Sequence, residues 1–205
     1  WGRTIRDDIT THPDLGLTIR PDLSAQHEWQ LAGAQGGVYT TGIGGSLTGR
    51  PVDLLIIDDP IKDREQADST IYRNRVWDWW TDVASTRLAP GAPVILILTR
   101  WHQDDLAGRL LNAPDGHRWK LLNIPAQAET NNDPLGRKPG QWLQSSRRRT
   151  TKQWEAIKQQ AGSRTFNSLY QGHPSPPGGT IFNRDHWIID PHPTWQADNN
   201  QQHWV

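Results

Sequence analysis

Two runs of apolar residues, each closed by polar residues, are the clearest elements of this chain. Leu54 to Ile57 runs into Asp58-Asp59-Pro60, and Val94 to Leu98 runs into Thr99-Arg100. Continuous apolar runs of this length are typical of strands that are buried on both faces of a parallel sheet. Proline cannot continue a ladder of hydrogen bonds, so the first strand ends there. The two runs predict neighbouring parallel strands.

The segment between the two runs has the spacing of a helix. From Glu65 to Leu88 apolar residues recur near helical intervals, and Pro90-Gly91 ends the pattern. A helix between two parallel strands is the usual crossover, so the segments predict a βαβ unit and an α/β fold. We also expect a short helix from Asp104 to Leu111 and another strand from Trp119 to Ile124.

Weaker patterns flank this unit on both sides. Glu28 to Thr41 predicts two short strands around the Gly33 to Gly37 turn, followed by a glycine-rich loop at 42–50. After Pro125 the composition becomes polar and turn-forming, which predicts a small linker subdomain outside the sheet. Within it we expect a helix from Thr151 to Gly162, a loop at 174–179 and an extended segment around 181–189.

Composition narrows the class of protein. The 205 residues contain no cysteine, which excludes a zinc finger and a thiol enzyme, and 22 basic residues balance 22 acidic ones, so nucleic acid would have to bind a local patch. No apolar run approaches the length of a membrane helix, and the first ten residues do not resemble a signal peptide. The chain begins at Trp1 and contains no methionine. We therefore expect an internal fragment of a soluble intracellular protein.

The carboxylates at the end of the first strand are the strongest chemical signal. Ligands bind at the carboxyl edge of a parallel sheet, where nucleotide hydrolases place one carboxylate on Mg²⁺ and a neighbour on the attacking water. Asp58 would hold the metal and Asp59 would orient the water. Thr99 and Arg100 should lie beside them, at the end of the next strand. The alternative is that the two aspartates only end the strand and begin a turn with Pro60.

A second acidic group follows the second strand. His102, Asp104 and Asp105 could bind a metal together with the strand-end carboxylates. Asp104 or Asp105 is better suited to capping the helix that follows, and we favour that interpretation.

The chain has one dense basic run and one cluster of tryptophans. Arg147, Arg148 and Arg149 with Lys152 could contact DNA phosphates independently of sequence, or could simply form a solvated face. Trp77, Trp79 and Trp80 lie on the predicted crossover helix. We assign these three to the core, because a protein that grips duplex backbone does not need to stack on bases.

Five segments in order resemble the large subunits of tailed-bacteriophage terminases. VYTTGIGGSLTGR at 38–50 is similar to the glycine-rich approach of that family, and VDLLIIDDPIKDREQADS from Val52 is similar to its Walker B strand. ILILTRWHQDDLAGRLL from Ile95 resembles its coupling motif. WKLLNIPA at 119–126 and FNSLYQGHPSPPGGTIF at 166–182 resemble its linker signatures.

The resemblance implies a three-part organisation. Residues 1–125 would be the C-terminal part of an ATPase domain, with the parallel sheet of a P-loop NTPase of the ASCE type and helices on both faces. Residues 126–180 would be the linker subdomain, and residues 181–205 the start of an RNase H-like nuclease domain. The implied function is an ATP-driven motor that moves double-stranded DNA into a procapsid, with a nuclease that cuts the concatemer.

The resemblance also implies roles for single residues. Asp58 matches the Walker B aspartate that binds Mg²⁺ with ATP, and Asp59 stands where many members have the catalytic glutamate. Thr99 matches the hydroxyl of the coupling motif, which relays the nucleotide state to DNA movement. Arg50 lies in a loop where some members carry an arginine that reaches the ATP of a neighbouring subunit, although such an arginine is more often solvated.

Two motifs expected of a complete terminase do not occur in these residues. There is no GxxxxGK[ST] phosphate loop and no recognisable set of nuclease carboxylates, and we do not assign Asp185 or Asp190 to catalysis. We therefore expect the fragment alone to be inactive. The two divalent metals of the nuclease would bind elsewhere in the full-length protein.

The resemblance further implies partners and a location. The partners would be double-stranded DNA, the portal protein, the terminase small subunit and other copies in a ring, but no membrane. The location would be the cytoplasm of the infected bacterium, transiently at the procapsid portal. Alternatives are another P-loop translocase or helicase, a non-enzymatic DNA-binding or capsid-interaction module, and a metal-dependent nuclease.

Overall fold

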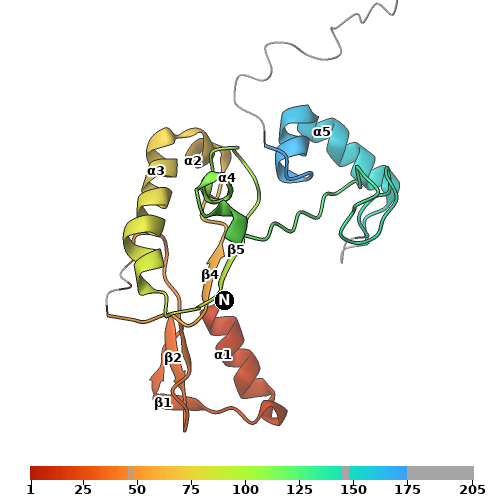
Figure 1. The fold of residues 1–205 in the computed structure, drawn as a ribbon. Helices are drawn as coiled ribbons and strands as arrows, with labels where there is room; N and C mark the ends of the chain where they lie inside the picture. Colours follow the sequence, from red (N-terminus) through yellow and green to blue (C-terminus); the bar gives the residue numbers. More distant parts are fainter. Residues whose placement is uncertain (46, 48, 145–147, 175–205) are drawn as a thin grey trace, which may run out of the picture. The chain divides into compact units, whose positions relative to one another are not determined.

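The computed structural model describes residues 1–45, 47, 49–144 and 148–174 (Figure 1). The chain divides between Leu122 and Asn123 into two compact units, and each unit has its own buried core. The end of the predicted linker, at 175–180, and the predicted nuclease start, at 181–205, lie outside the described residues. Among the described residues, no helix is both long enough and apolar enough to cross a membrane.

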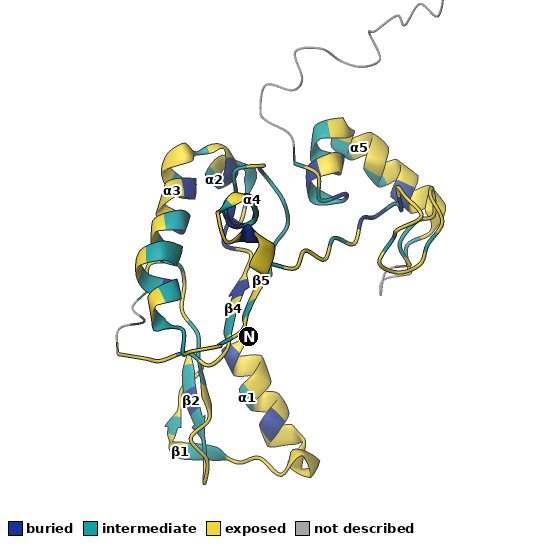
Figure 2. Cartoon of the chain, viewed as in Figure 1, coloured by how far each residue is buried: buried dark blue, intermediate teal, exposed yellow. Residues whose placement is uncertain are grey.

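The first unit begins with a helix and a three-stranded antiparallel sheet. The elements are α1 (Gly2–Thr11), β1 (Ile19–Ser24), β2 (Glu28–Leu31) and β3 (Gly37–Tyr39), with a 3₁₀ turn at Pro13–Leu15. β2 and β3 form the predicted hairpin, whereas the sequence analysis did not predict α1 and β1. Most of α1 is exposed (Figure 2), and the helix contacts the sheet where the indole Nε1 of Trp29 donates to the Gly2 carbonyl at 2.9 Å.

The predicted βαβ unit is present, with a small parallel sheet. β4 (Leu55–Asp58) and β5 (Val94–Ile97) pair in parallel, with Leu55 opposite Val94 and Asp58 opposite Ile97. The apolar runs form these strands because β-branched side chains pack well on a pleated surface. The carboxyl ends of both strands therefore meet at one edge of the sheet.

The two strands are buried on one face, and the prediction of burial on both faces is wrong for the described chain. Residues of β4 and β5 that face the core alternate with residues that face outward. Ile57 is 5% exposed, and Leu55, Val94 and Leu96 pack against the same core. The opposite face is uncovered by any described element, and its four apolar side chains are about half exposed: Leu54 50%, Ile56 55%, Ile95 46% and Ile97 53%.

The crossover between the strands is not the single long helix that was predicted. It consists of α2 (Arg64–Asp68), α3 (Thr70–Asp78), a π-helical segment (Trp79–Ala84) and a 3₁₀ turn (Ser85–Arg87). Ser69 interrupts the helix because it is extended, at φ −76° and ψ 112°, and its side chain caps α3 by accepting from the amide of Tyr72. Ile71, which the helical pattern would have placed in the core, is 84% exposed.

The core of the first unit lies between the crossover, β4–β5 and the helix that follows. That helix, α4 (Leu106–Asn112), agrees with the predicted one and precedes a 3₁₀ turn at Gly116–Arg118. The buried core residues are Ile57, Ile61, Ala67, Val76, Leu106 and Leu110. Trp77, Trp79 and Trp80 pack against this core, as predicted.

The strand predicted from Trp119 to Ile124 is absent. Trp119 packs edge-on against Trp80, with ring centroids 5.8 Å apart, but the segment pairs with no strand of the described chain. Leu121 and Leu122 are exposed. A strand needs a neighbour to accept its backbone hydrogen bonds, and an apolar run cannot reveal whether one is present.

The described part of the second unit encloses an aromatic core beside one long helix. α5 (Thr151–Leu169) includes the predicted helix and continues past a kink at Gly162, where φ is 70°. Thr150 and Gln153 form a reciprocal capping box at its start. Trp154 and Phe166 of α5 are buried, and the ring of Trp142 stacks on Trp154 with centroids 5.9 Å apart.

Candidate active site

Asp58 and Asp59 lie at the carboxyl end of β4, where the sequence analysis placed them. Asp58 is the last residue of the strand, opposite Ile97 of β5. The backbone amide of Asp59 still donates to the Ile97 carbonyl at 2.9 Å, so the ladder continues for one bond past the strand. Pro60, which has no amide hydrogen, then turns the chain away. Both carboxylates are exposed at this edge.

Asp59 joins the ends of the two strands through its side chain. Its φ of 41° is in the left-handed region, which aspartate and asparagine adopt more readily than most residues. In this conformation its Oδ1 accepts a hydrogen bond from the backbone amide of Thr99 at 2.9 Å. The structure therefore brings Asp59 and Thr99 together, with the Thr99 amide holding one carboxylate oxygen in a fixed direction.

The side chain of Asp58 bonds to the first residue of the chain. Its Oδ2 accepts a hydrogen bond from the indole Nε1 of Trp1 at 2.5 Å, and both side chains are exposed. Alternation along β4 places Asp58 on the same face of the sheet as Ile56, the uncovered one. A ligand that approaches this face would reach the carboxylate directly.

The two carboxylates are suitable donors for Mg²⁺ bound together with a nucleotide. Mg²⁺ commonly takes one or two carboxylates and completes its shell with water and phosphate oxygens. Each carboxylate can accept several hydrogen bonds or metal contacts, so the bonds from Trp1 and Thr99 leave acceptor capacity on both. In the described part of the chain no group of three or more His, Asp or Glu residues is placed to hold a metal by itself.

Arg100 does not lie beside these carboxylates, and that expectation is wrong. Its Nε donates to Oδ2 of Asp105 at 2.6 Å, and the Asp105 side chain is only 2% exposed. The other oxygen of Asp105 accepts from the amide of Gly108, so Asp105 caps α4 as predicted. Burial raises the pKa of Asp105 above its ordinary value, although Arg100 and the Gly108 amide favour its charged form. Arg100 thus fastens the end of β5 to α4.

Asp104 forms ion pairs with two arginines that were not predicted from the sequence. Arg109 donates to both of its oxygens at 2.8 Å, and Arg73 of α3 donates through Nε at 3.1 Å. The hydrogen bonds from Arg109 and then Arg73 lower the pKa of Asp104 to about 2. Arg73 is buried although its position in the helix carries no apolar signal, and only the geometry of the fold reveals it.

The acidic group after β5 is therefore structural. His102 accepts from the amide of Asp104 through Nδ1 at 3.0 Å, and burial lowers the pKa of His102. With Asp105 capping a helix and Asp104 paired to arginines, this group does not join Asp58 and Asp59 as metal ligands.

The chain matches a known protein family. A family model described as terminase large subunit, T4likevirus-type, N-terminal matches residues 11–187. The chain belongs to this family. Membership assigns it to phage DNA packaging, and the match spans Asp58, Asp59 and Thr99 together with most of both units. A search of curated proteins found no match.

Arg50 of this terminase chain is engaged within its own subunit. Its guanidinium forms two hydrogen bonds to the carboxylate of Glu28, at 2.6 and 3.1 Å, and lies over the ring of Tyr39 at 4.3 Å. The bonded pair raises the pKa of Arg50 and lowers the pKa of Glu28. Its action on a neighbouring subunit remains a prediction, and it would require Arg50 to leave Glu28.

The basic run lies at the start of α5 in the second unit. Arg147 lies outside the described residues. Arg148 and Lys152 are exposed, and Arg149 lies over the ring of Trp154, 5.0 Å from its centroid. The role of these cations in binding DNA remains a prediction.

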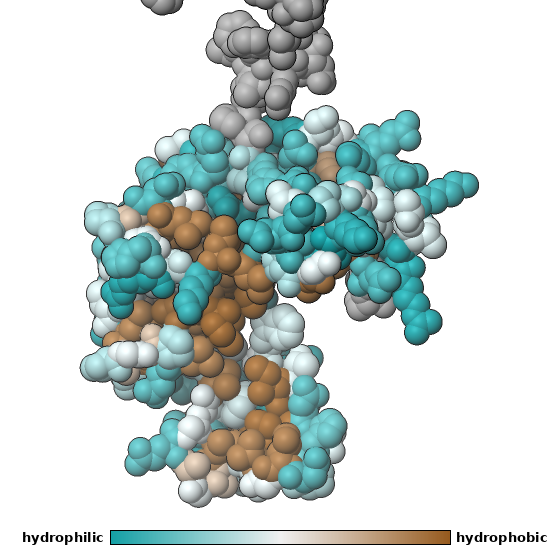
Figure 3. Space-filling model, turned by 45° about the vertical axis from the view of Figure 1, so that its right-hand side comes forward, coloured by the Kyte–Doolittle hydropathy of each residue, from teal (hydrophilic) through white to brown (hydrophobic). Residues whose placement is uncertain are grey.

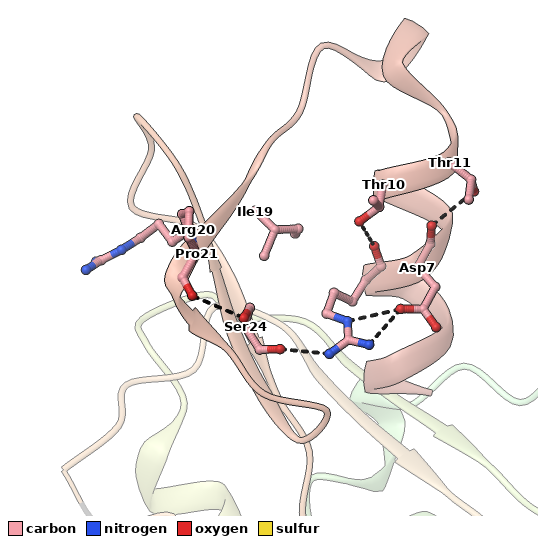
Figure 4. A pocket seen from close by; sticks show the side chains of 8 residues that line it. Asp7, Thr10, Thr11, Ile19, Arg20, Pro21 and Ser24 are labelled. Atoms are coloured by element: carbon pink, nitrogen blue, oxygen red, sulfur yellow. Dashed lines mark hydrogen bonds and ion pairs between the residues drawn. The ribbon is translucent and has the colours of Figure 1, made fainter.

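A hollow of about 430 Å³ lies between α1 and β1 of the terminase chain (Figure 4). Arg6 lines it and donates to Asp7 and to the Ser24 carbonyl, the latter at 2.7 Å. Thr10 and Thr11 donate back to carbonyls of their own helix. The polar groups around this hollow are occupied by one another, and the hollow is remote in sequence from the strand-end carboxylates.

Proposed function

We propose that Asp58 and Asp59 are the Walker B carboxylates of a DNA-packaging ATPase. Asp58 would hold Mg²⁺ bound with ATP, and Asp59 would orient and deprotonate the attacking water. The observation that carries the proposal is the pair of carboxylates at the shared edge of β4 and β5, with Asp59 bonded to Thr99. It occurs in a chain that belongs to the terminase large-subunit family.

The arrangement divides the chemistry between the two side chains. Asp58 presents an exposed carboxylate, which suits a hydrated cation. The Thr99 amide fixes Oδ1 of Asp59, which leaves Oδ2 to accept a proton from water. When bound, MgATP supplies the phosphoryl group and most of the charge neutralisation.

Thr99 is a positioning residue for the motor in this proposal. Its amide follows any movement of the Asp59 carboxylate, and the next residue, Arg100, is paired to Asp105 at the start of α4. A change at the hydrolysis site would therefore reach the end of β5 and α4 through two directed bonds. This path runs through the backbone of residues 99 and 100, whereas the coupling role that the family resemblance gives to Thr99 belongs to its side-chain hydroxyl at the same strand end.

The remaining features of the motor belong to the same proposal. The sheet would be part of a P-loop fold of the ASCE type, and the half-exposed face of β4–β5 supports a further layer of structure there. Residues 126–180 would be the linker and 181–205 the start of an RNase H-like nuclease, which cuts DNA with two divalent metals. Arg50 would act in trans within a homo-oligomeric ring at the portal, in the host cytoplasm, with the small subunit as a further partner.

Mutants of the two aspartates, tested in the gene product that contains this chain, separate the two proposed roles. Asp58→Asn should raise the Mg²⁺ concentration required for ATP hydrolysis. Asp59→Asn should lower turnover by about 100-fold or more and spare nucleotide binding, because it removes a base of this kind. Asparagine also tolerates a left-handed backbone and keeps an oxygen for the Thr99 amide, so the fold should survive.

Asp53→Asn is the matched control, since Asp53 is an exposed aspartate just before β4. It should hydrolyse ATP at the wild-type rate. Wild-type hydrolysis by Asp59→Asn, or an equal loss in Asp53→Asn, would remove Asp59 from the proposed role.

Thr99→Val tests the proposed coupling. Valine keeps the backbone amide that binds Asp59 and removes only the hydroxyl. ATP hydrolysis should continue while DNA packaging per ATP falls. If hydrolysis and packaging both stay at wild-type rates, Thr99 is only the end of a strand.

A further inference from the structure

The neutral chain separates its charges between the two units. Residues 1–122 contain 13 basic and 16 acidic side chains, a formal charge of −3, whereas residues 123–205 contain nine basic and six acidic ones, a charge of +3. Within the second unit the positive charge is concentrated at 123–174, where eight basic and three acidic side chains give +5. The second unit is therefore positively charged, although the net charge of the whole chain is zero. Duplex DNA, as a dense polyanion, is attracted to the second unit and repelled by the first.

Two of the three acidic side chains at 123–174 are already bound. Asp133, whose side chain is 1% exposed, accepts from Nε and Nη2 of Arg137 at 2.9 and 2.7 Å. Glu129 accepts from Gln171 and pairs with His173, both at 2.8 Å. Arg137 also donates to the Pro125 carbonyl, so it stabilises the unit and is not available to a ligand. Glu155 is the remaining acidic residue at 123–174.

Three other cations of this unit lie on its surface. Lys138, Arg148 and Lys152 are exposed, and Arg149 is half-buried over Trp154. Arg149 borders an open hollow of about 1090 Å³, which Glu155 and several side-chain amides and hydroxyls also line, including Gln141, Gln144, Thr150 and Thr151. Amides and hydroxyls are neutral donors that commonly contact phosphate oxygens in protein–DNA complexes.

The aromatic side chains of this unit are not placed to read bases. Trp154 is buried, and Trp142 is partly covered by its stack on Trp154. Stacking on unpaired bases requires an exposed ring. The available chemistry is positive charge with polar donors, which recognises phosphates rather than sequence.

We infer that the second unit binds the phosphate backbone of duplex DNA through Lys138, Arg148 and Lys152, apart from the strand-edge carboxylates. The inference rests on the proposed packaging function for its choice of duplex DNA over another polyanion. It adds Lys138 to the basic run seen in the sequence. It excludes Arg137, because Arg137 already forms an ion pair with Asp133.

The test measures binding of the whole 205-residue chain to labelled 30-base-pair duplexes of two unrelated sequences over a range of salt concentrations. The wild-type chain should bind both alike, and its affinity should fall with salt at a log–log slope near −0.9 for each phosphate contact. Arg148→Gln with Lys152→Gln should reduce that slope by about 2, because each substitution removes about one contact. At 100 mM salt we expect roughly tenfold weaker binding.

A matched control removes the same charge from the first unit. Arg118→Gln with Lys120→Gln neutralises two exposed cations there and should change the DNA affinity by less than about twofold. Thermal melting confirms that both double variants are folded. Equal losses in the two variants, unchanged binding in Arg148→Gln with Lys152→Gln, or tighter binding to an acidic polypeptide than to duplex DNA would overturn the inference.

The two proposals fail separately. Loss of salt-dependent DNA binding in the second unit would leave the ATPase result for Asp59→Asn intact. Wild-type hydrolysis by Asp59→Asn would leave the charge pattern and the DNA measurement intact.

Discussion

The two units of this chain bury their apolar residues to different extents and carry opposite charges. The first unit, Trp1–Leu122, leaves one face of its parallel sheet half exposed, and Figure 3 shows apolar surface gathered on this unit. The described part of the second unit encloses its aromatic residues and presents mostly polar surface in the same view. The first unit therefore has a sheet with one uncovered face and contains the candidate site. The second unit has an enclosed core and a positive charge.

This difference matches the two tasks proposed for the chain. Parallel sheets are ordinarily covered on both faces, so the uncovered face of β4–β5 is a surface for further protein structure. The second unit needs no such cover, because Trp142, Trp154 and Phe166 already pack together and Gln171 bonds both polar atoms of its amide to the backbone of Gln127. Its surface is therefore free to meet a charged partner.

The largest expected effect comes from the core of the second unit. Trp154→Ala should destabilise it by about 3 to 5 kcal/mol, because it empties a buried site and removes the bond from the indole to the Leu143 carbonyl. Hydrogen exchange should show protection lost at 123–174 and kept in β4 and β5. Leu110→Ala, in the other core, should give the reverse pattern. Loss of protection in both units from either change would show that they do not unfold independently.

The next effect concerns the pair that fastens β5 to α4. Asp105→Ala should destabilise the first unit by about 2 to 4 kcal/mol, because it leaves Arg100 unpaired where its side chain is only 16% exposed and uncaps the Gly108 amide. Asp105→Asn, which keeps an oxygen for the cap, should cost less. Urea denaturation measures both, and equal values for the two variants would rule out a contribution from the cap oxygen beyond that of the charge.

Acid should weaken both units over the same interval of pH. Arg109 and Arg73 lower the pKa of Asp104, and Arg137 lowers the pKa of Asp133, in each case to about 2 from an ordinary 3.8. A depressed folded-state pKa contributes stability that is complete above about pH 4 and lost as the pH falls through about 2. Carboxyl NMR titration should place both pKa values well below 3.8. Ordinary values would mean that the arginine pairs do not persist in solution.

The smallest effect on stability should come from the uncovered sheet face. Ile56→Lys with Ile95→Lys should change stability by less than about 1 kcal/mol, because both side chains are already half exposed. The same change should reduce self-association of the chain, since exposed apolar patches promote it. Ile71→Lys, at an apolar residue 84% exposed on α3, is the control and should leave association unchanged. Sedimentation velocity of the wild-type chain, the double variant and the control measures self-association. Equal self-association of all three would show that the sheet face does not cause it.

The sequence predicts strands and caps better than it predicts their surroundings. The apolar runs located β4 and β5, and the turn residues located the β2–β3 hairpin. Burial on both faces was wrong because cover depends on elements that the run itself does not encode. Ser69 interrupted the crossover because its side chain can cap a new helix at that point, which apolar periodicity does not register.

The candidate site shows the same division. The positions of Asp58, Asp59 and Thr99 followed from the ends of the strands, because parallel strands bring their carboxyl ends to one edge. The bond from the Thr99 amide to Asp59 could not be predicted, since it depends on the left-handed φ of Asp59. Nor could the turn of Arg100 toward Asp105, which depends on the burial of that carboxylate.

The most direct test of the account measures ATP turnover and duplex-DNA affinity on one preparation of the Asp59→Asn gene product. The account predicts that turnover, with or without DNA, falls by about 100-fold or more, because the base at the strand edge is lost. It predicts that DNA affinity stays within about twofold of wild type, because the cations that bind phosphate lie in the other unit. Wild-type turnover, or DNA affinity lost together with turnover, would contradict the division of tasks between the two units.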